Sequence, residues 1–445
     1  MNEIKKPDIN ILCHLQEDNN NLYQEENNMN NRIIVPNTLI LGIDIAKENH
    51  YGQFVVNGEY IKKPFLIKNT RESFECLLDS IRQLKAKYNL DYVLVGMEPT
   101  GHYWKNLAYY LKSQGIELCL VNPYHVNKIK ELEDNSPTKN DKKDAKIISK
   151  LIYQGQYLNC MFEEELYVNL RLCSNNRQEL KKQFISEKVR LIALLDEYFP
   201  EFKKMFSDIL GKSALCILKT CPFPQDIVNI GVSELTQKLL DATHNRVGFK
   251  KAELVFNAAK TSIGVPVGLE GARYRLRLIL RQLEALQKEL DDVEKLMEEY
   301  LLQTGYSEYL LSIKGVGIVT AAGFLAEIGD ISKYDSYKQI QKVAGLNLKE
   351  TSSGMKKGKT KISKRGRSNL RNILYQAATV MVAKNAAFKE IYTHLTKRQE
   401  NQLTGKQAIV ALSVRLIKVM YTLCKKKTTY THDKVHGLTS YQQAA

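Results

Sequence analysis

The sequence predicts an α/β domain near the N-terminus, a central antiparallel pair of long helices, and a mainly α-helical C-terminal domain. Three observations predict this order. Short apolar segments alternate with amphipathic segments before residue 160. A three-four apolar repeat runs from Leu276 to Tyr300 and is typical of a coiled-coil seam. After residue 305, helical segments flank a loop rich in lysine and arginine.

Composition narrows the function classes. The 445 residues include 65 Lys and Arg against 49 Asp and Glu, so a polyanionic partner such as nucleic acid is expected. We find no run of about 18 apolar residues and no signal-peptide core, and we expect no membrane span and a cytoplasmic, nucleoid-associated protein. The eight scattered cysteines lack zinc spacing and are expected to be reduced thiols. Residues 1–36 are interpreted as a disordered polar leader.

The first domain, 37–160, is predicted from its element order. Strands are expected at 38–46, 51–58, 59–69, 92–101 and 116–122, with helices at 71–88 and 102–115 and a further helical region after them. An Asn-Gly pair at 57–58 predicts a tight hairpin turn. The resulting order β-β-β-α-β-α-β-α predicts a mixed sheet with helices on its faces, as in RNase H-like folds.

Acidic residues fall where such a fold gathers its ligands. Asp44 ends the first strand and Glu98 ends the fourth, and ligands collect beyond the carboxyl ends of such strands. Asp141 and Asp144 are three apart and share one face of a helix. Converging carboxylates need a cation between them, and oxygen-only ligands suit Mg²⁺ or Mn²⁺. We therefore predict a metal site for phosphoryl transfer, with the neighbouring lysines holding phosphate.

Each acid also has a simpler interpretation. Asp44 could cap a turn, and Glu98 could cap the helix that follows it. Asp141 and Asp144 could belong to a solvated helix face with local lysine partners. The metal site is favoured because all four acids fall at positions that the predicted order of strands and helices would bring together.

The central region, 161–304, is interpreted as a coiled-coil hairpin. One long helix is expected at about 163–198 and a second along the repeat from Leu276, with a small helical insert at about 199–265. Such a hairpin could be a spacer within one chain or a contact between two subunits.

The third region, 305–425, begins with a helix, a Gly-Val-Gly turn and a second helix. That turn could bind phosphate or simply allow tight packing. The loop after it has the charge and backbone freedom that suit phosphate contacts. The predicted nucleic-acid contacts are Lys356, Lys357, Lys359, Lys361, Lys364, Arg365, Arg367 and Arg371. Ser352 and Ser353 stand at its edge, and composition does not distinguish a nucleophile from a turn residue. Residues 426–445 are a tail.

Several segments resemble one known family. These are LGIDIAKENH, GMEPTGHYW, VNPYHVNKIK, NDKKDAKIISK, IKGVGIVTAAGFLAEIGD, AGLNL and SSGMKKGKTKISKRGRSNLR. They are similar to DEDD transposases of the insertion-sequence one-ten family, over about 38–155 and 305–385. The Asn-rich leader and the long insert depart from minimal members.

The resemblance implies a RuvC-like N-terminal domain whose acidic set is Asp44, Glu98, Asp141 and Asp144. It also implies a C-terminal serine nucleophile at Ser353, with Ser352 as its rival. The implied activity is DNA cleavage and strand exchange by a bacterial insertion-sequence transposase, with Mg²⁺ or Mn²⁺ as cofactor. An element-encoded bridge RNA and assembly into dimers or tetramers are further implications.

Three other classes remain as alternatives. A RuvC-like junction-resolving endonuclease would use metals alone and would not need the serine loop. An actin-like sugar kinase or ATPase shares the strand order, but it predicts Gly-rich phosphate loops of which we find no convincing set, and it leaves the basic loop without a role. A non-catalytic nucleic-acid binder would not need all four acids.

Overall fold

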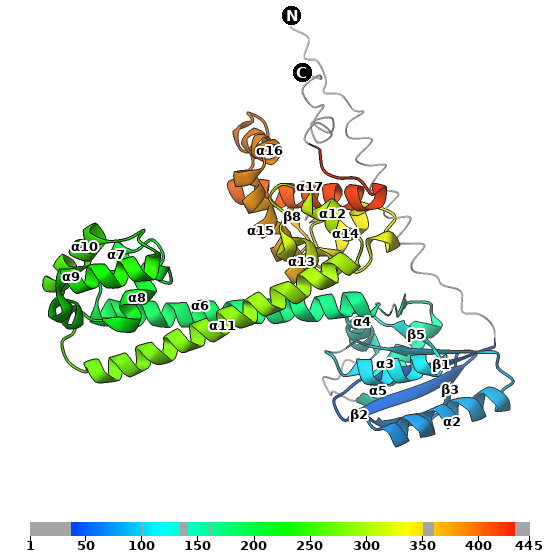
Figure 1. The fold of residues 1–445 in the computed structure, drawn as a ribbon. Coiled ribbons are helices and arrows are strands. Elements are labelled where there is room, and N and C mark those ends of the chain that lie inside the picture. Colours follow the sequence, from blue (N-terminus) through cyan, green and yellow to red (C-terminus); the bar gives the residue numbers. More distant parts are fainter. Residues whose placement is uncertain are drawn as a thin grey trace, which may run out of the picture. The chain divides into compact units, whose positions relative to one another are not determined.

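The computed structural model describes residues 37–99, 101–133, 141–160, 162, 164–349 and 360–431. The chain divides into two compact units, Met1–Phe162 and Glu163–Ala445 (Figure 1). The predicted leader at 1–36 lies outside the described residues, as does the tail from residue 432.

The first unit is a mixed sheet with helices on both faces. Its elements are β1 (Thr38–Asp44), β2 (Asn49–Val56), β3 (Glu59–Lys68), α2 (Arg71–Lys87), β4 (Tyr92–Met97), α3 (Trp104–Ser113), β5 (Glu117–Leu120), α4 (Pro123–Glu133), α5 (Asp141–Tyr153) and β6 (Leu158–Asn159). The strand order is β3-β2-β1-β4-β5-β6, with β1 antiparallel to β2 and parallel to β4. The predicted order of strands and helices is confirmed from β1 to β5, and it fits the RuvC-like, RNase H-like fold. The predicted last helical region consists of two helices, α4 and α5, and the short strand β6 was not predicted.

Alternation along β1 divides the core between the two faces of the sheet. Leu39, Leu41 and Ile43 pack with α2 and α3, whereas Ile40 packs with α4 and α5. The Asn57-Gly58 hairpin turn is present as predicted, since both residues have positive φ, 51° and 86°.

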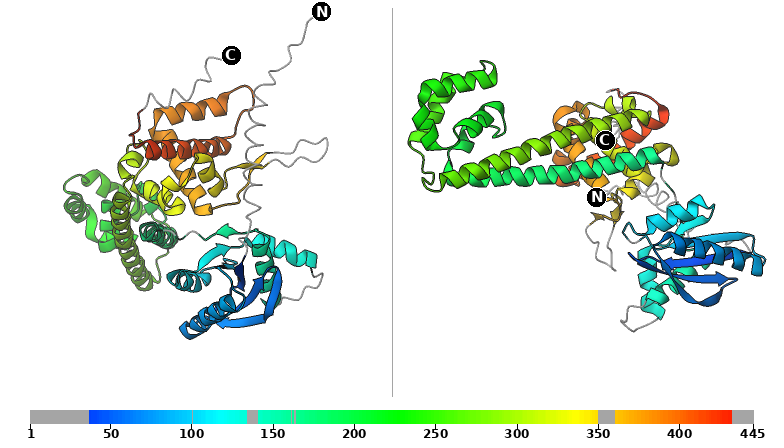
Figure 2. Two further views of the ribbon diagram at one scale, coloured as in Figure 1. Left: turned by 90° about the vertical axis from the view of Figure 1, so that its right-hand side faces the viewer. Right: turned by 60° about the horizontal axis from the view of Figure 1, so that its bottom comes forward.

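The second unit contains a long helical hairpin, which we call the arm. Its helices are α6 (Glu165–Tyr198) and α11 (Leu269–Gln303), and they lie side by side in Figure 2. Arg177 Nε lies 2.7 Å from Glu294 Oε1 between them. The start of α6 shares a core with the end of α11, and the end of α6 shares a core with the first half of α11, so the helices run antiparallel.

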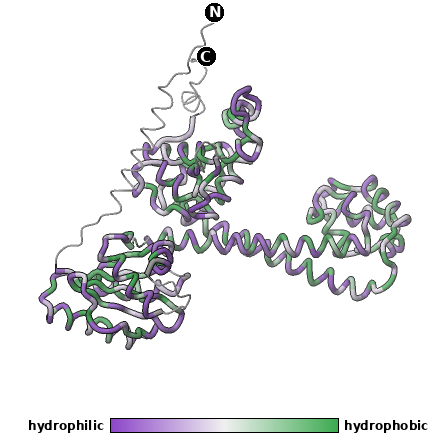
Figure 3. The backbone as a smooth tube through the Cα atoms, turned by 180° about the vertical axis from the view of Figure 1, so that it is seen from behind, coloured by the Kyte–Doolittle hydropathy of each residue, from purple (hydrophilic) through white to green (hydrophobic). Residues whose placement is uncertain are grey.

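The apolar repeat of α11 is covered within the chain. Leu276, Ile279 and Leu283 are buried together with Leu191 and Leu194 of α6. Figure 3 shows hydrophilic and hydrophobic residues alternating along both helices, as expected of amphipathic helices that pack by one face.

The insert closes the far end of the arm as a small helical bundle. It contains α7 (Phe202–Met205), α8 (Lys212–Thr220), α9 (Pro224–Thr243) and α10 (Phe249–Lys260). Phe199, Phe202 and Phe223 are fully buried in it. Arg273 of α11 forms an ion pair with Asp226 of α9 at 2.5 Å, which ties the bundle to the arm.

The rest of the second unit is a helical core. Its elements are α12 (Ser307–Leu311), α13 (Ile318–Ile328), the 3-10 helix η1 (Ile331–Lys333), α14 (Tyr337–Val343), β7 (Leu348–Lys349), β8 (Lys361–Ile362), α15 (Ser368–Lys384), α16 (Ala386–Lys397) and α17 (Gly405–Lys426). In the Gly-Val-Gly turn, Gly315 has φ +104° and packs against Met381, which favours the packing interpretation of that turn.

Helix α17 is long and apolar enough, by length and composition, to cross a membrane, although the sequence predicted no membrane span. Half of its apolar window is buried inside the structure, and Leu412, Leu416 and Ile417 are fully buried in the core of the unit. The same composition is typical of the core helix of a globular domain. The seven described cysteines are free thiols, as predicted.

Candidate functional site

Asp44 and Glu98 follow the same register position of two neighbouring parallel strands. Ile43 of β1 lies opposite Met97 of β4 in the last pair of this ladder, and Asp44 and Glu98 are the next residues. Paired strands are about 4.8 Å apart. Both acids are half-buried. The structure therefore places the two carboxylates at one edge of the sheet.

Two close approaches define the direction of α5 across that sheet. A Cβ at Gly42 of β1 would collide with the Ser149 backbone of α5. Tyr153, the last residue of α5, would lie 3.1 Å from a Cβ at Gly58, in the turn after β2. Because that turn lies near the start of β1, α5 runs antiparallel to β1. Its N-terminal turn consequently points toward the carboxyl edge.

The remaining two acids lie on this N-terminal turn. Asp44 is two residues beyond Gly42 on the same face of β1, about 7 Å along the strand. Asp144 is five residues before Ser149, about 7.5 Å along the helix in the same direction. Asp141 is the first residue of α5. Asp144 and Asp44 therefore lie toward the same edge and on the same face.

A second glycine contact supports this seating. Gly96 of β4 lies opposite Gly42, and a Cβ there would collide with Ile152 of α5. Glu98 is two residues beyond Gly96 and so shares its face. The side chain-free surface of two paired glycines lets α5 approach the sheet closely.

The described acids of the sheet edge do not form a ligand cluster. Among the described residues, no group of three or more His, Cys, Asp or Glu side chains is placed to hold a metal ion. Asp144 instead has a lysine partner: Lys130 Nζ of α4 lies 2.5 Å from Asp144 Oδ2. The Asp144 side chain is 8% exposed, so its buried charge is compensated by the ammonium.

His50 holds the turn after Asp44, a role that the sequence analysis missed. Its ring is fully buried, and Nδ1 accepts a hydrogen bond from the Ala46 N–H at 3.2 Å. Burial lowers the pKa of His50 and favours the neutral ring. The one feature that pointed to this role of His50 is that a polar residue occupies a buried position of β2.

The described segments on either side of the basic loop, which we call the base of the loop, contact each other through their backbones. The short strands β7 and β8 pair, with Leu348 opposite Ile362. Next to this pair of strands, Gly345 and Gly366 lie in close contact. A Cβ at Gly345 would lie 2.8 Å from the Arg365 carbonyl oxygen, and a Cβ at Gly366 would lie 2.7 Å from the Gly345 nitrogen. Two segments of backbone meet here because neither glycine has a side chain.

Two arginines of the predicted nucleic-acid set have internal partners. Arg371 donates to the Ala344 carbonyl at 2.8 Å, and Arg367 donates to the Glu327 carbonyl. Arg367 also lies 3.9 Å from the buried Glu327 carboxylate. These contacts brace the base of the loop.

The other predicted loop residues divide between two groups. Lys361, Lys364 and Arg365 are exposed at the base of the loop. Ser352, Ser353, Lys356, Lys357 and Lys359 lie outside the described residues.

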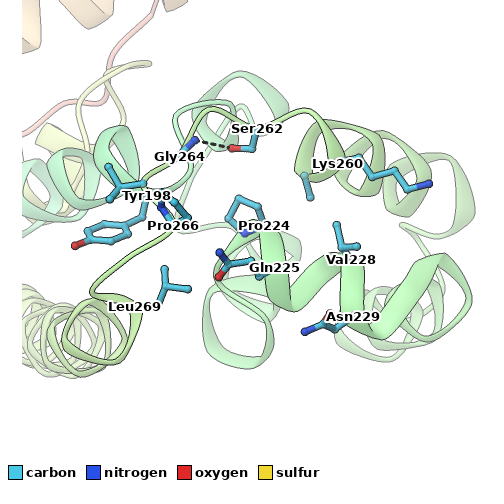
Figure 4. A pocket seen from close by; sticks show the side chains of 12 residues that line it. Tyr198, Pro224, Gln225, Val228, Asn229, Lys260, Ser262, Gly264, Pro266 and Leu269 are labelled. Carbon is cyan, nitrogen blue, oxygen red and sulfur yellow. Dashed lines mark hydrogen bonds between the residues drawn. The ribbon is translucent and has the colours of Figure 1, made fainter.

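A separate pocket of about 350 Å³ lies in the insert (Figure 4). Tyr198, Pro224 and Val228 line it, together with a loop in which the Gly264 N–H donates to Ser262 Oγ at 3.2 Å. Its lining contains no acid or histidine. The candidate functional residues are therefore the acids at the sheet edge of the first unit and, separately, the basic residues beside the loop of the second unit.

Two models of transposase families match this chain, one in its N-terminal part and one in its C-terminal part. A family model described as a transposase and named for DEDD enzymes of IS110 matches residues 41–200. A second, described as the transposase IS116/IS110/IS902 family, matches residues 307–393. The first range contains all four predicted acids.

Individual relatives extend over most of the chain. An IS116 insertion-element protein of Streptomyces clavuligerus is 26% identical over 88% of this chain and 96% of that protein. A pilin gene-inverting protein of Moraxella bovis is 23% identical over 88% of this chain and 97% of its own length. Among solved structures, T. thermophilus RuvC with a Holliday junction substrate is 10% identical, with a TM-score of 0.21, over 27% of this chain and 99% of that chain.

The first family model covers the residues of the acidic sheet edge, and the second covers the basic loop, in the order in which they occur along the chain. The chain belongs to the IS116/IS110/IS902 family of DEDD transposases, and it is a DNA transposase, an enzyme of DNA recombination.

Proposed function

We propose that the chain cleaves and rejoins DNA strands of an insertion sequence and its target, using a metal-binding acidic site and a serine nucleophile. The acidic site is formed by Asp44, Glu98, Asp141 and Asp144. The observation that carries this proposal is the placement of Asp44 beside Glu98, with the N-terminal turn of α5 at the same edge.

The donor set suits a divalent metal, Mg²⁺ or Mn²⁺. All four side chains offer carboxylate oxygens, which these hard cations prefer. Asp144 is buried and already compensated by the Lys130 ammonium, so this position requires a positive charge. When bound, the ion would supply charge stabilisation at the phosphate oxygens. The family implies dependence on a divalent metal, and the choice between the two ions is our proposal.

We assign the nucleophile to Ser353 in the basic loop, with Ser352 as the alternative. The hydroxyl oxygen forms a bond to phosphorus as one phosphorus–oxygen bond to a deoxyribose breaks, so that the ester oxygen leaves with the sugar. The serine proton passes, through a base or solvent, to the released sugar oxygen. One phosphodiester is exchanged for another, so the strand can be rejoined to a new partner without an energy source. A serine hydroxyl needs activation for this step.

The loop supplies the charge that holds DNA. We propose phosphate contacts for the described residues Lys361, Lys364 and Arg365, which are exposed at its base. Lys356, Lys357 and Lys359 are proposed from the sequence alone. Arg367 and Arg371 are proposed to brace the base, because their guanidinium groups donate to Glu327 and Ala344.

The proposed partners are DNA, a guide RNA and further copies of the chain. The guide RNA, in the form of an element-encoded bridge RNA, and assembly into dimers or tetramers follow from the family resemblance. Action on DNA also implies a cytoplasmic, nucleoid-associated location.

A second candidate is a junction-resolving endonuclease that uses metals alone. It would hydrolyse a phosphodiester with water and leave no covalent adduct on the protein. The similarity to a gene-inverting protein favours strand exchange over hydrolysis, because inversion rejoins every strand that it cuts.

The acidic site is tested with Asp44→Asn, Glu98→Gln and Asp144→Asn in a recombination assay. Each variant should lose strand cleavage while it keeps its affinity for DNA. Asp79→Asn, on the exposed face of α2, is the matched control and should remain active. Full recombination by Asp44→Asn would refute the assignment.

A further inference from the structure

Helix α11 is divided by charge into two halves. Residues 269–288 contain five Arg and Lys against two Glu, whereas residues 289–303 contain six Asp and Glu against one Lys. The basic half lies at the end of the arm that carries the insert. In the sequence it is separate from the four acids and from the basic loop of the proposed active site. A net positive charge at this end attracts a polyanion.

The basic half borders a groove of about 440 Å³ between α8 and α11. Its lining residues are Lys219, Tyr274, Arg277, Leu280, Arg281 and Glu284. Leu280 is 5% exposed and forms an apolar floor. Lys219 Nζ lies 2.5 Å from Glu284 Oε1, and this pair connects the two helices at one side of the groove.

Three side chains of the groove lie in one row along α11. Tyr274, Arg277 and Arg281 are spaced by three and four residues and therefore share a helix face. The Tyr274 residue is 63% exposed, which is unusual for a large ring. The row combines one accessible aromatic face with two guanidinium groups.

The two arginines of this row have no partner in the part of the chain that the structure describes. No side-chain hydrogen bond, ion pair or ring contact involves Arg277 or Arg281 there, and none involves the Tyr274 side chain. Their neighbour Arg273, by contrast, is held by Asp226 at 2.5 Å. The row therefore does not serve the internal packing of the arm.

We propose that this groove binds single-stranded nucleic acid, with a base stacked on Tyr274 and phosphates held by Arg277 and Arg281. An aromatic ring can stack only on a base whose face is accessible, which holds for an unpaired strand and not for the interior of a duplex. Guanidinium groups pair well with phosphate oxygens. The site lies outside the acidic edge and the serine loop, and its binding does not depend on their chemistry.

A rival occupant is the acidic half of α11 from a second copy of the chain. Charge alone would suit that pairing. It gives no role to an exposed Tyr274 above an apolar floor, however, whereas base stacking uses both the ring and the floor. We therefore favour the unpaired strand and treat the second copy as an outcome of the test.

The test uses full-length protein and short labelled oligo(U), oligo(dT) and duplex DNA of the same length, followed by fluorescence anisotropy at several salt concentrations. Arg277→Ala/Arg281→Ala should weaken single-strand binding and reduce the salt slope by about 1.4, at roughly 0.7 per lost contact. Tyr274→Ala should weaken it roughly tenfold, and Tyr274→Phe should not, because stacking needs only the ring. The probe that loses affinity identifies the strand as RNA or DNA.

The matched control is Lys203→Ala/Lys250→Ala, which removes two exposed charges from other helices of the insert. It should leave single-strand binding unchanged, and duplex binding should be unchanged in all variants. Two results would overturn the proposal. One is wild-type affinity and salt slope for the single strands in the arginine and tyrosine variants. The other is a lower oligomeric mass by light scattering with single-strand binding intact, which would assign the groove to a second copy.

Discussion

Lys130 Nζ of α4 lies 2.5 Å from Asp144 Oδ2 of α5, fourteen residues away in the sequence. The carboxylate is nearly buried and the lysine is one-third exposed. A buried carboxylate without a cation is costly, so Lys130 stabilises Asp144 in the absence of a metal. In the proposed function a divalent ion would take over that role.

Lys130→Met should therefore destabilise the first unit in metal-free buffer, by about 1–3 kcal/mol, because it leaves a buried charge unpaired. Mg²⁺ should raise the melting temperature of this variant more than that of the wild type, since a bound cation replaces the ammonium. Calorimetry with and without Mg²⁺ measures both effects.

Lys128→Met is the control for that experiment. Lys128 pairs with Glu131 at 2.6 Å on the same helix, but both side chains are exposed and the pair is expected to contribute little. An equal Mg²⁺ response in the wild type and in Lys130→Met would show that Asp144 does not belong to the metal site.

Gly42→Ala should displace α5 from the sheet. The added Cβ would collide with the Ser149 backbone, and overpacking of this kind costs about 1–3 kcal/mol. The displacement would also move Asp144 relative to Asp44, so cleavage should fall while DNA binding persists. Denaturant unfolding and a cleavage assay measure the two effects.

Gly271→Ala provides a comparison in α11, where a Cβ would meet no atom within 4 Å. It should raise the stability of the chain slightly, because alanine has a higher helix propensity than glycine. If Gly42→Ala were as stable and active as the wild type, the close seating of α5 would not position the acids.

The order of elements could be predicted because β1, β4 and β5 are compact, largely apolar segments with clear ends. The two-residue strand β6 is too short to be predicted in this way. Asp44 and Glu98 stand at two such ends, so their edge placement followed from the fold. Lys130 could not be found in this way, since its partner is set by how α4 and α5 pack and not by spacing. The boundary between these helices was not predicted either.

Composition also could not show what a charged or apolar side chain contacts. Arg367 and Arg371 were predicted to contact phosphates, yet their side chains donate to the backbone carbonyls of Glu327 and Ala344. The repeat containing Leu283 fitted either a spacer or a subunit contact, and in the structure it is covered by α6. The hydrogen bond of His50 links a strand to a turn, and no periodicity reveals such a link.

Leu283→Ala should destabilise the chain itself, by about 2–5 kcal/mol, because it opens a cavity between α6 and α11. The change in unfolding midpoint should be independent of protein concentration. Leu302→Ala, 60% exposed on the same helix, should have little effect. Unchanged unfolding with loss of a dimer by light scattering would instead place the repeat between subunits.

Neutralising Lys361, Lys364 and Arg365 should weaken duplex DNA binding and flatten its salt dependence by roughly 0.9 per lost contact. The control removes Arg82, Lys85 and Lys87 from α2, on the face of the sheet opposite α5. Anisotropy titrations over a range of KCl concentrations measure the slope. An unchanged slope in the loop variant would show that the base of the loop does not touch DNA.

The most direct test of the strand-exchange account is a covalent adduct between protein and DNA. The protein, with its guide RNA where that is required, is incubated with end-labelled DNA and Mg²⁺, denatured, and separated on a gel. We predict label on the protein that is lost in Ser353→Ala, is retained in Ser352→Ala, and does not form in Asp44→Asn. Strand cleavage without any adduct would contradict the account and support metal-only hydrolysis, and an adduct that survives Ser353→Ala would place the nucleophile at another residue.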